Sequence, residues 1–521
     1  MTYSHFKDLL LPSAYQEPTA TVNLVQTHIS LIFITDNFVY KIKKPVDFGF
    51  LNFSTLDRRR FYCAEEVRLN RRLCPNMYLG VVEVRETPDG CTFAGEGKII
   101  DYAVKMRRLP EERMLNRLLD NNQVTEQDIR CIARTIAGFH LACERGKEID
   151  LYGSPDAILR NWNENFAQSE AFVGFTISAA EFELLRGWVN SFQAANLQLF
   201  EERVAGGFIR DCDGDIHSEN ICLADTVYIF DCIEFNNRFR YSDTTADIAF
   251  LLMDFDFHRK AEFAEPFLEE YLKVTGDQGI VSLIDYYKTY RAFVRGKVES
   301  FRLNDPQISP VEKSLASDKA RRYFRLAGGY VRRRLLPPSL IITWGLTGTG
   351  KSHIVEELAF VLGLDIHASD PVRKELAGMI LTERHLDSYA EGIYTAEHTK
   401  ATYSTLLQRA ESSLAMGKSV IVDATFCSKS NREAFRRLAN RADARFLIIA
   451  VNCPPETVKA RLAERQLKDG EVSDGRWEIY LKQSADCEAL TDNEGEILEI
   501  NTENPPNDNL NRLLDLLCGQ N

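Results

Sequence analysis

The stretch GLTGTGKS at positions 345–352 has the residue types and spacing that bind the phosphates of a nucleotide. Glycines let the backbone wrap tightly so that successive N–H groups point at phosphate oxygens, the lysine adds a movable positive charge, and the serine would ligate Mg²⁺. The predicted phosphate-binding residues are Gly345, Thr347, Gly348, Thr349, Gly350, Lys351 and Ser352. A glycine-rich turn without a ligand is the alternative. The flanking patterns, a buried strand over 340–344 and a helix over 354–362, favour nucleotide binding.

Two carboxylates near predicted strand ends would complete this site. Asp423 ends the apolar stretch 419–423, an arrangement that places an acid near the Mg²⁺ ion and its water. Asp370 follows a short strand and would accept a proton from an attacking hydroxyl, while Arg373 would hold the substrate. Asp370 is also a good helix N-cap because Pro371 follows it, and both roles can hold together.

Arg461 and Arg465 lie four residues apart on a predicted helix that follows the strand 446–452. Arginines at this spacing share a helix face and could close over the transferring phosphoryl group as a lid. An ordinary solvated helix face is an equally good interpretation.

A second set of polar residues lies nearer the N-terminus. Asp215 and Asn220 are five residues apart, and Asp231 ends a strand eleven residues later. This spacing is typical of a catalytic loop in which the first aspartate orients the acceptor hydroxyl as base, while the asparagine and the second aspartate hold Mg²⁺. The alternating Asp211, Asp213 and Asp215 suggest a calcium-binding loop that starts at residue 211. Such a loop is excluded, because its sixth position is Ile216 rather than glycine and its twelfth is Cys222 rather than glutamate. A plain polar hairpin is the remaining alternative.

The cation for this second site would come from an upstream strand. In FVYK at 38–41, strand alternation puts Val39 and Lys41 on one face, which suits an apolar residue against adenine and an ammonium group on the phosphates. Lys43 and Lys44 are rivals for the lysine role.

A carboxylate that orients Lys41 is expected from the helix over 56–73. Glu66 is our choice, and its neighbour Glu65 is the alternative, since exposed charged residues are common on such helices. Met106, at the end of the last strand, would lie at the hinge between two lobes.

These side chains need two different scaffolds. Residues 1–108 are strand-rich and residues 109–334 are mostly helical, which predicts an α+β bilobal domain. Pro337 and Pro338 end the preceding helix, and the strand after them opens a third region, 335–521, with the alternating strands and helices of a doubly wound parallel sheet.

Composition narrows the functional classes. The 521 residues are 45% hydrophobic and 27% charged, as in globular proteins, and the net charge of −13 argues mildly against a surface that coats nucleic acid or anionic membrane. No stretch has the apolar length of a spanning helix, and we expect a cytoplasmic protein. The 12 cysteines form no CxxC pair, so we expect most to be small core residues in a reducing compartment. A zinc site at Cys212, His217 and Cys222 is a weak alternative because the spacing matches no known zinc module.

Residues 339–518 resemble small P-loop kinases of the gluconate-kinase, chloramphenicol-phosphotransferase, zeta-toxin and polynucleotide-kinase-like types, through GLTGTGKS, SDPVRKEL, VIVDATF and CPPETVKARLAER. The resemblance implies phosphorylation of a hydroxyl, with the D-x-x-R pair at Asp370 and Arg373, the acidic strand end at Asp423 and lid arginines at Arg461 and Arg465.

Residues 20–330 resemble the aminoglycoside-phosphotransferase branch of the protein-kinase-like fold, through VYKIKKPVDFGF, EEVRLNRRL, GDIHSEN, IFDCIEF and DTTADIAFLLMD. The resemblance implies that Asp215 is the base, Asn220 and Asp231 bind metal, and Asp247 supports the loop. Two departures are the aspartate at 213, where that branch usually has histidine, and the lack of a G-x-G-x-x-G loop, for which Thr27 to Ser30 could substitute. The tandem order resembles a bacterial group of two-domain proteins.

The leading hypothesis is an enzyme with two ATP- and Mg²⁺-dependent phosphotransferase sites that act on hydroxyls of small molecules. One alternative is a P-loop kinase regulated by a non-catalytic, ligand- or nucleotide-binding kinase-like domain. Another is a kinase of nucleic-acid 5′-hydroxyls or sugar nucleotides, although nucleic acid is an unlikely partner at this charge. The oligomeric state and the acceptor have no readable signal.

Overall fold

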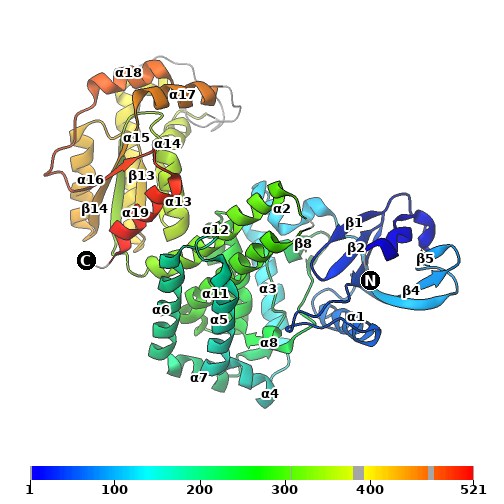
Figure 1. The fold of residues 1–521 in the computed structure, drawn as a ribbon. Helices are drawn as coiled ribbons and strands as arrows, with labels where there is room; N and C mark the ends of the chain where they lie inside the picture. Colours follow the sequence, from blue (N-terminus) through cyan, green and yellow to red (C-terminus); the bar gives the residue numbers. More distant parts are fainter. Residues whose placement is uncertain (1–2, 307, 380–391, 467–474, 520–521) are drawn as a thin grey trace. The chain divides into compact units, whose positions relative to one another are not determined.

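The computed structural model describes residues 3–306, 308–379, 392–466 and 475–519. The chain forms two compact units, Met1–Ala327 and Gly328–Asn521, and the division falls inside the helix α12 (Pro310–Arg332). Each unit has its own sheet and its own apolar core (Figure 1).

The first lobe of unit 1 is a six-stranded antiparallel sheet of order β1-β2-β3-β6-β4-β5 with one helix, α1, packed against β4 and β6. Thr55 caps α1 by accepting the N–H of Arg58, and Asp57 lies in its first turn, where a negative charge is favourable. The elements are β1 (Asn23–Gln26), β2 (Ser30–Ile34), β3 (Phe38–Lys43), α1 (Leu56–Asn70), β4 (Tyr78–Thr87), β5 (Gly90–Thr92) and β6 (Lys98–Arg107).

The second lobe is helical, and two short antiparallel strand pairs, β7 with β10 and the hairpin of β8 and β9, carry the polar loop of residues 211–231. Its core helix α9 is buried along almost its whole length. The helices are α2 (Leu115–Asp120), α3 (Glu126–Ala142), α4 (Lys147–Asp150), α5 (Pro155–Ser169), α6 (Ala179–Ala195), α7 (Leu197–Ala205), α8 (Asn237–Arg240), α9 (Thr244–Phe257), α10 (Ala264–Thr275) and α11 (Ile280–Phe301). The strands are β7 (Ile209–Asp211), β8 (Ile221–Leu223), β9 (Val227–Ile229) and β10 (Tyr241–Asp243). The bilobal α+β fold predicted for this part of the chain is confirmed.

Unit 2 is built on a five-stranded, all-parallel sheet of order β12-β13-β11-β14-β15, with helices on its faces (Figure 1). The central strands are continuous apolar runs, as expected for strands covered on both sides. The strands are β11 (Ser339–Trp344), β12 (Asp365–Ala368), β13 (Val420–Asp423), β14 (Arg445–Asn452) and β15 (Glu496–Asn501). The helices are α13 (Lys351–Leu362), α14 (Ser369–Leu376), α15 (Ala396–Ala415), α16 (Lys429–Arg441), α17 (Pro455–Gln466), α18 (Trp477–Asp486) and α19 (Pro506–Cys518). The predicted doubly wound parallel sheet is confirmed.

Within the described residues, ten cysteines are free and eight of these are buried, which fits small core residues. Cys427 and Cys487, sixty residues apart, form a disulfide that the sequence analysis did not anticipate. Among the described helices, none combines the length and the apolar character needed to cross a membrane.

Candidate active sites

The predicted phosphate loop lies between β11 and α13, with Lys351 as the first residue of the helix and Gly350 at its N-cap. Gly348 adopts a φ of +77°, and a Cβ atom there would come within 2.9 Å of Leu462 on α17. Gly350 has a φ of +96°. Both positions therefore need glycine for a left-handed backbone, and the first also needs it for close packing.

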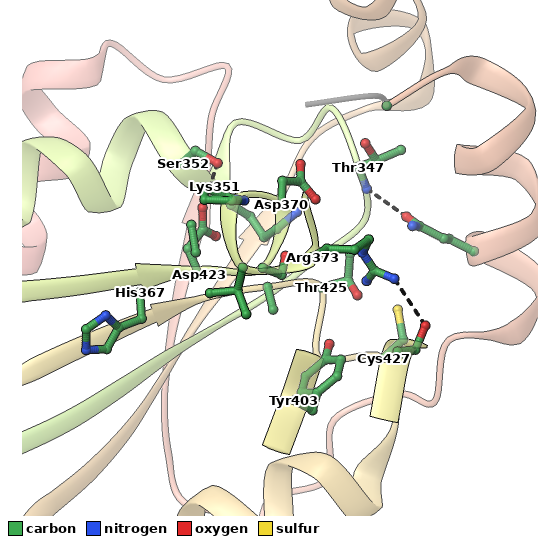
Figure 2. Close-up of a pocket in the computed structure, with 18 of the residues that line it drawn as sticks. Thr347, Lys351, Ser352, His367, Asp370, Arg373, Tyr403, Asp423, Thr425 and Cys427 are labelled. Atoms are coloured by element: carbon green, nitrogen blue, oxygen red, sulfur yellow. Dashed lines mark hydrogen bonds between the residues drawn. The ribbon is translucent and has the colours of Figure 1, made fainter. Parts of the chain in front are cut away.

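Ser352 and Asp423 meet at the carboxyl ends of adjacent parallel strands (Figure 2). The Ser352 hydroxyl donates to Asp423 Oδ2 at 2.6 Å, and Thr343 Oγ1 donates to Asp423 Oδ1 at 3.1 Å. A hydroxyl and a carboxylate held this closely are oxygen ligands of the kind that Mg²⁺ prefers. The donor set thus fits the metal that the loop motif implies.

Lys351 is buried and donates to the carbonyl oxygen of Leu346 at 2.8 Å. Burial lowers its pKa below the ordinary value, Asp423 and Asp370 oppose this, and Arg465 adds to it. Asp370 and Asp423 are thus the anionic groups that favour the charged form of this lysine. Figure 2 shows Lys351, Asp370 and Asp423 gathered at one end of the sheet.

Arg373 lies on α14 with only 8% of its surface exposed. Its Nη1 donates to the Ile393 carbonyl at 3.0 Å and to Thr399 Oγ1 at 3.2 Å, while its Nε has no hydrogen-bond partner among the residues that the structure describes. An unsatisfied buried guanidinium N–H is costly without a ligand. Asp370 is in the first turn of α14, and the N-cap is Ala368, so the N-cap interpretation of Asp370 is wrong.

The two arginines predicted to form a lid lie on α17, and both border the phosphate loop. Arg461 donates to Thr502 Oγ1 and to the Thr502 carbonyl, each at 2.8 Å, and so joins α17 to the segment after β15. Arg465 lines the cavity beside the phosphate loop.

A cavity of about 1220 Å³ joins the phosphate loop to Asp370, Arg373 and Asp423. A smaller one of about 310 Å³ lies on the other side of Gly348 and Gly350, and Arg461, Thr502 and Pro506 line it. Opposite the loop, α18 covers the large cavity, and the N–H of Thr347 donates to Gln483 Oε1 at 2.9 Å (Figure 2).

In unit 1, the loop before β8 brings Asp215 and Asn220 together. Asn220 Nδ2 donates to the Asp215 carboxylate and to its backbone carbonyl, each at 3.1 Å. His217 Nδ1 accepts the N–H of Glu219 at 3.3 Å, and its Nε2 lies 3.5 Å from Asp215 Oδ2. Burial would raise the pKa of Asp215, but His217 and the arginines of α11 outweigh it and hold the pKa below its ordinary value.

Asp231 follows the β8–β9 hairpin and has a left-handed φ of 67°. Its carboxylate lies 2.5 Å from Lys41 Nζ, and Lys41 lies 3.0 Å from Glu66 Oε1. The structure thus brings together the lysine, the helix carboxylate and the second metal-site aspartate expected from the sequence. The alternative Glu65 instead pairs with Arg68 on an exposed part of α1.

Two aspartates of helix α9 accept hydrogen bonds from the loop that carries Asp215. Asp247 accepts the N–H groups of Asp213 at 3.0 Å and Gly214 at 2.8 Å. Asp254, two turns later, accepts the N–H and the hydroxyl of Ser218 at 2.8 and 2.6 Å. Seven residues separate these aspartates, so they share one helix face and hold both halves of the loop.

Several supporting contacts were not anticipated, although Lys43 was named as a rival for the phosphate-binding lysine. Lys43 and Glu234 form a buried ion pair beside Glu66, and His140 on α3 lies 3.2 Å from Asp247. The only sequence signal was that Lys43 stands two residues from Lys41 on the same strand face.

The remaining expectations have these outcomes. The zinc alternative is wrong for the described residues: Cys212 donates to the Ser242 carbonyl and Cys222 to that of Pro110, and the metal-type cluster that includes Cys212 does not include His217. Met106 is buried in β6 next to the second lobe's Cys222 and Tyr228. The turn 27–30, suggested as a substitute for the glycine-rich loop, is held by an internal hydrogen bond in which Thr27 Oγ1 accepts the N–H of Ser30 at 3.0 Å.

Several known proteins are similar to parts of this chain. A family model described as an AAA domain matches residues 340–490, which agrees with the phosphate loop and the parallel sheet of unit 2. A sugar kinase from Janibacter sp. HTCC2649 is 18% identical with a TM-score of 0.28, and covers 35% of this chain and 97% of its own. A choline/ethanolamine kinase family protein from Mesorhizobium loti is 12% identical with a TM-score of 0.36, and covers 63% of this chain and 98% of its own.

The uncharacterized protein Rv2004c of Mycobacterium tuberculosis is 30% identical over 436 residues, which are 83% of this chain and 83% of that protein. The match is long enough to include parts of both units. The chain therefore belongs to the same protein family as Rv2004c.

Proposed function

We propose that each unit is an ATP- and Mg²⁺-dependent phosphotransferase that acts on a hydroxyl group of a small molecule. The observation that carries the proposal is the large cavity of unit 2, in which Lys351, Ser352 and Asp423 share one space with Asp370 and Arg373. A phosphate loop with a metal-type donor pair faces a carboxylate and a buried guanidinium across that space. This is the arrangement that phosphoryl transfer needs, because positioning and charge stabilisation supply most of its catalysis.

In unit 2, the triphosphate would lie along the loop and the base and ribose would enter the smaller cavity at Arg461 and Thr502. Ser352 and Asp423 would hold Mg²⁺, which when bound neutralises charge on the phosphate oxygens. Lys351 would leave the Leu346 carbonyl for the phosphates. Asp370 would accept the proton of the acceptor hydroxyl, and Arg373 would contact the acceptor through its unpaired Nε.

In unit 1, Asp215 would be the base, and Asn220 and Asp231 would hold Mg²⁺. The lowered pKa of Asp215 keeps this carboxylate ionised, the form that can accept a hydrogen bond from the acceptor hydroxyl. Lys41 would exchange Asp231 for the phosphates of ATP, while Glu66 keeps the lysine oriented.

The test uses the full chain with Mg²⁺, ATP and a metabolite extract, and detects products by the added mass of one phosphoryl group. Lys351→Ala should abolish one product and Asp215→Asn a different one. Lys418→Ala, on an exposed part of unit 2, and Asp225→Asn, at the tip of the β8–β9 hairpin, are matched controls that should keep both products.

Other outcomes separate the alternatives. Loss of all transfer in Lys351→Ala, with no effect of Asp215→Asn, would make unit 1 a regulatory nucleotide- or ligand-binding domain. Transfer to 5′-hydroxyl oligonucleotides or sugar nucleotides, but to no small molecule in the extract, would contradict the proposed acceptor class.

A further inference from the structure

Unit 1 contains a second lysine beside the one expected to bind phosphate. Lys43 follows Lys41 by two residues on β3, and its side chain is only 1% exposed. Its Nζ lies 2.5 Å from Glu66 Oε2 and also contacts Glu234 Oε1. The other oxygen of Glu66, Oε1, lies 3.0 Å from Lys41 Nζ. The Glu66 carboxylate is fully buried and lies between the two ammonium groups. The two lysines hold the pKa of Glu66 down at about 2 against the opposing effect of burial.

Each lysine also holds one carboxylate of the segment 231–234. Lys41 contacts Asp231, and Lys43 contacts Glu234 three residues later. The backbone of the same segment is tied at the N–H of Cys232, which donates to Asn70 Oδ1 on α1 at 3.0 Å. Strand β3, helix α1 and the Asp231 loop therefore meet at one chain of alternating charges, which is buried at Lys43, Glu66 and Glu234 and partly exposed at Asp231.

Binding of Mg·ATP would change the contacts of Lys41 but not those of Lys43. Lys41 and Asp231 would have to part, one to the phosphates and the other to the metal. Lys43 has no such role, because its side chain is enclosed and both of its partners are buried. Once Lys41 and Asp231 have separated, the Lys43 bridge would still connect Glu66 to the Asp231 loop. That loop needs restraint, since Asp231 holds a left-handed backbone that costs free energy in a residue other than glycine.

We propose that Lys43 and Glu234 are positioning residues of the unit 1 site, and that their bridge holds the Asp231 loop against Glu66 so that Asp231 is presented to Mg²⁺. The inference rests on the proposed function of unit 1. Lys43 and Glu234 do not contact the nucleotide in this proposal. Their loss should therefore raise the Mg²⁺ concentration that ATP binding requires. It should leave the affinity for ATP at saturating Mg²⁺ almost unchanged. Residues that hold a metal ligand in place typically contribute 10- to 100-fold to metal affinity.

The test measures ATP binding by calorimetry over a range of Mg²⁺ concentrations, in full-length protein that carries Lys351→Ala to silence unit 2. The double variant Lys43→Met/Glu234→Gln removes the bridge without leaving either charge unpaired in the interior. We expect the Mg²⁺ concentration for half-maximal ATP binding to rise about tenfold, with ATP affinity at saturating Mg²⁺ within about threefold of the parent. Lys41→Met should instead weaken ATP binding at every Mg²⁺ concentration.

The control is another buried ion pair of the same lobe, Arg59 with Asp101, where the two side chains are 4% and 0% exposed. Arg59→Met/Asp101→Asn should lower the unfolding temperature without changing the Mg²⁺ requirement, because this pair is not part of the chain of charges around Glu66. A purely structural role for Lys43 and Glu234 would give the same pattern as this control.

An unchanged Mg²⁺ requirement in the folded double variant overturns the inference. If that variant does not fold, Glu234→Asp decides in its place: it keeps the charge but shortens the bridge, and its Mg²⁺ requirement should rise, whereas an unchanged value overturns the inference. Absence of any Mg·ATP binding in the Lys351→Ala parent contradicts the proposed function of unit 1 itself, and is seen before a bridge variant is measured.

Discussion

Asp213 is a buried carboxyl group that lies two residues before Asp215 and beside Asp247. Burial, and then the charge of Asp247, raise its pKa well above the ordinary value of 3.8. Its Oδ1 accepts the N–H of Asp215 at 3.1 Å. Asp213 therefore holds the backbone of the proposed catalytic loop at the position where the aminoglycoside-phosphotransferase pattern usually has histidine.

Replacing Asp213 by asparagine should remove a pH dependence of stability. A carboxyl group with a raised folded-state pKa binds its proton more tightly in the native state, so its contribution to stability is present at low pH and is lost as pH rises from about 3.8 through the folded-state pKa. Asparagine keeps the acceptor oxygen and does not titrate. Asp213→Asn should therefore be more stable than the wild type at pH 8, with a smaller difference at pH 5, in urea unfolding of the full chain. Equal stability at both pH values would show that Asp213 is not held neutral.

At the scale of elements, two helices form hydrogen bonds that hold the loops on which the predicted site residues lie. Helix α9 holds the proposed catalytic loop of unit 1 through Asp247 and Asp254. Helix α18 lies over the phosphate loop of unit 2 through Gln483, and its C-terminal end is joined to the loop after β13 by the disulfide between Cys427 and Cys487. In both units a loop is shaped by a helix distant from it in the sequence.

Removing the disulfide should destabilise unit 2 and leave unit 1 unchanged. A cross-link that closes a loop of sixty residues restricts the unfolded chain, which gives a stabilisation of about 4 kcal/mol. Cys427→Ser/Cys487→Ser should lose most of it, as measured by hydrogen exchange of β11 and β13 at rising urea. Cys131→Ser, a free cysteine of unit 1, is the control. Unchanged exchange in unit 2 of the double variant would contradict the expectation.

The parts of the two sites that the sequence predicts are those with short-range spacing. The phosphate loop, the pair Asp215 and Asn220, and Asp423 at the end of an apolar strand can be recognised because neighbouring residues determine their local structure. Lys43 and Glu234 lie 191 residues apart and Cys427 and Cys487 sixty, so their pairing depends on tertiary packing that no local pattern contains. The alternative interpretation of Asp370 as an N-cap is wrong because α14 begins one residue before it, and helix boundaries are hard to place from sequence.

At the scale of the whole molecule, each unit has its own sheet, its own core and its own set of site residues. The unit 1 site, with Asp215 and Lys41, lies entirely within residues 1–327, and the phosphate loop with Asp423 lies entirely within residues 328–521. The central claim is therefore the proposal that the chain carries two nucleotide sites, one built from residues of each unit.

The most direct test of this central claim is the number of Mg·ATP sites per chain, measured by equilibrium titration of the full-length protein with a non-hydrolysable ATP analogue and Mg²⁺. The account predicts two sites in the wild type, loss of one in Lys351→Ala, loss of the other in Lys41→Met, and loss of both in the double variant. A single site that Lys351→Ala abolishes and Lys41→Met leaves unchanged would contradict it.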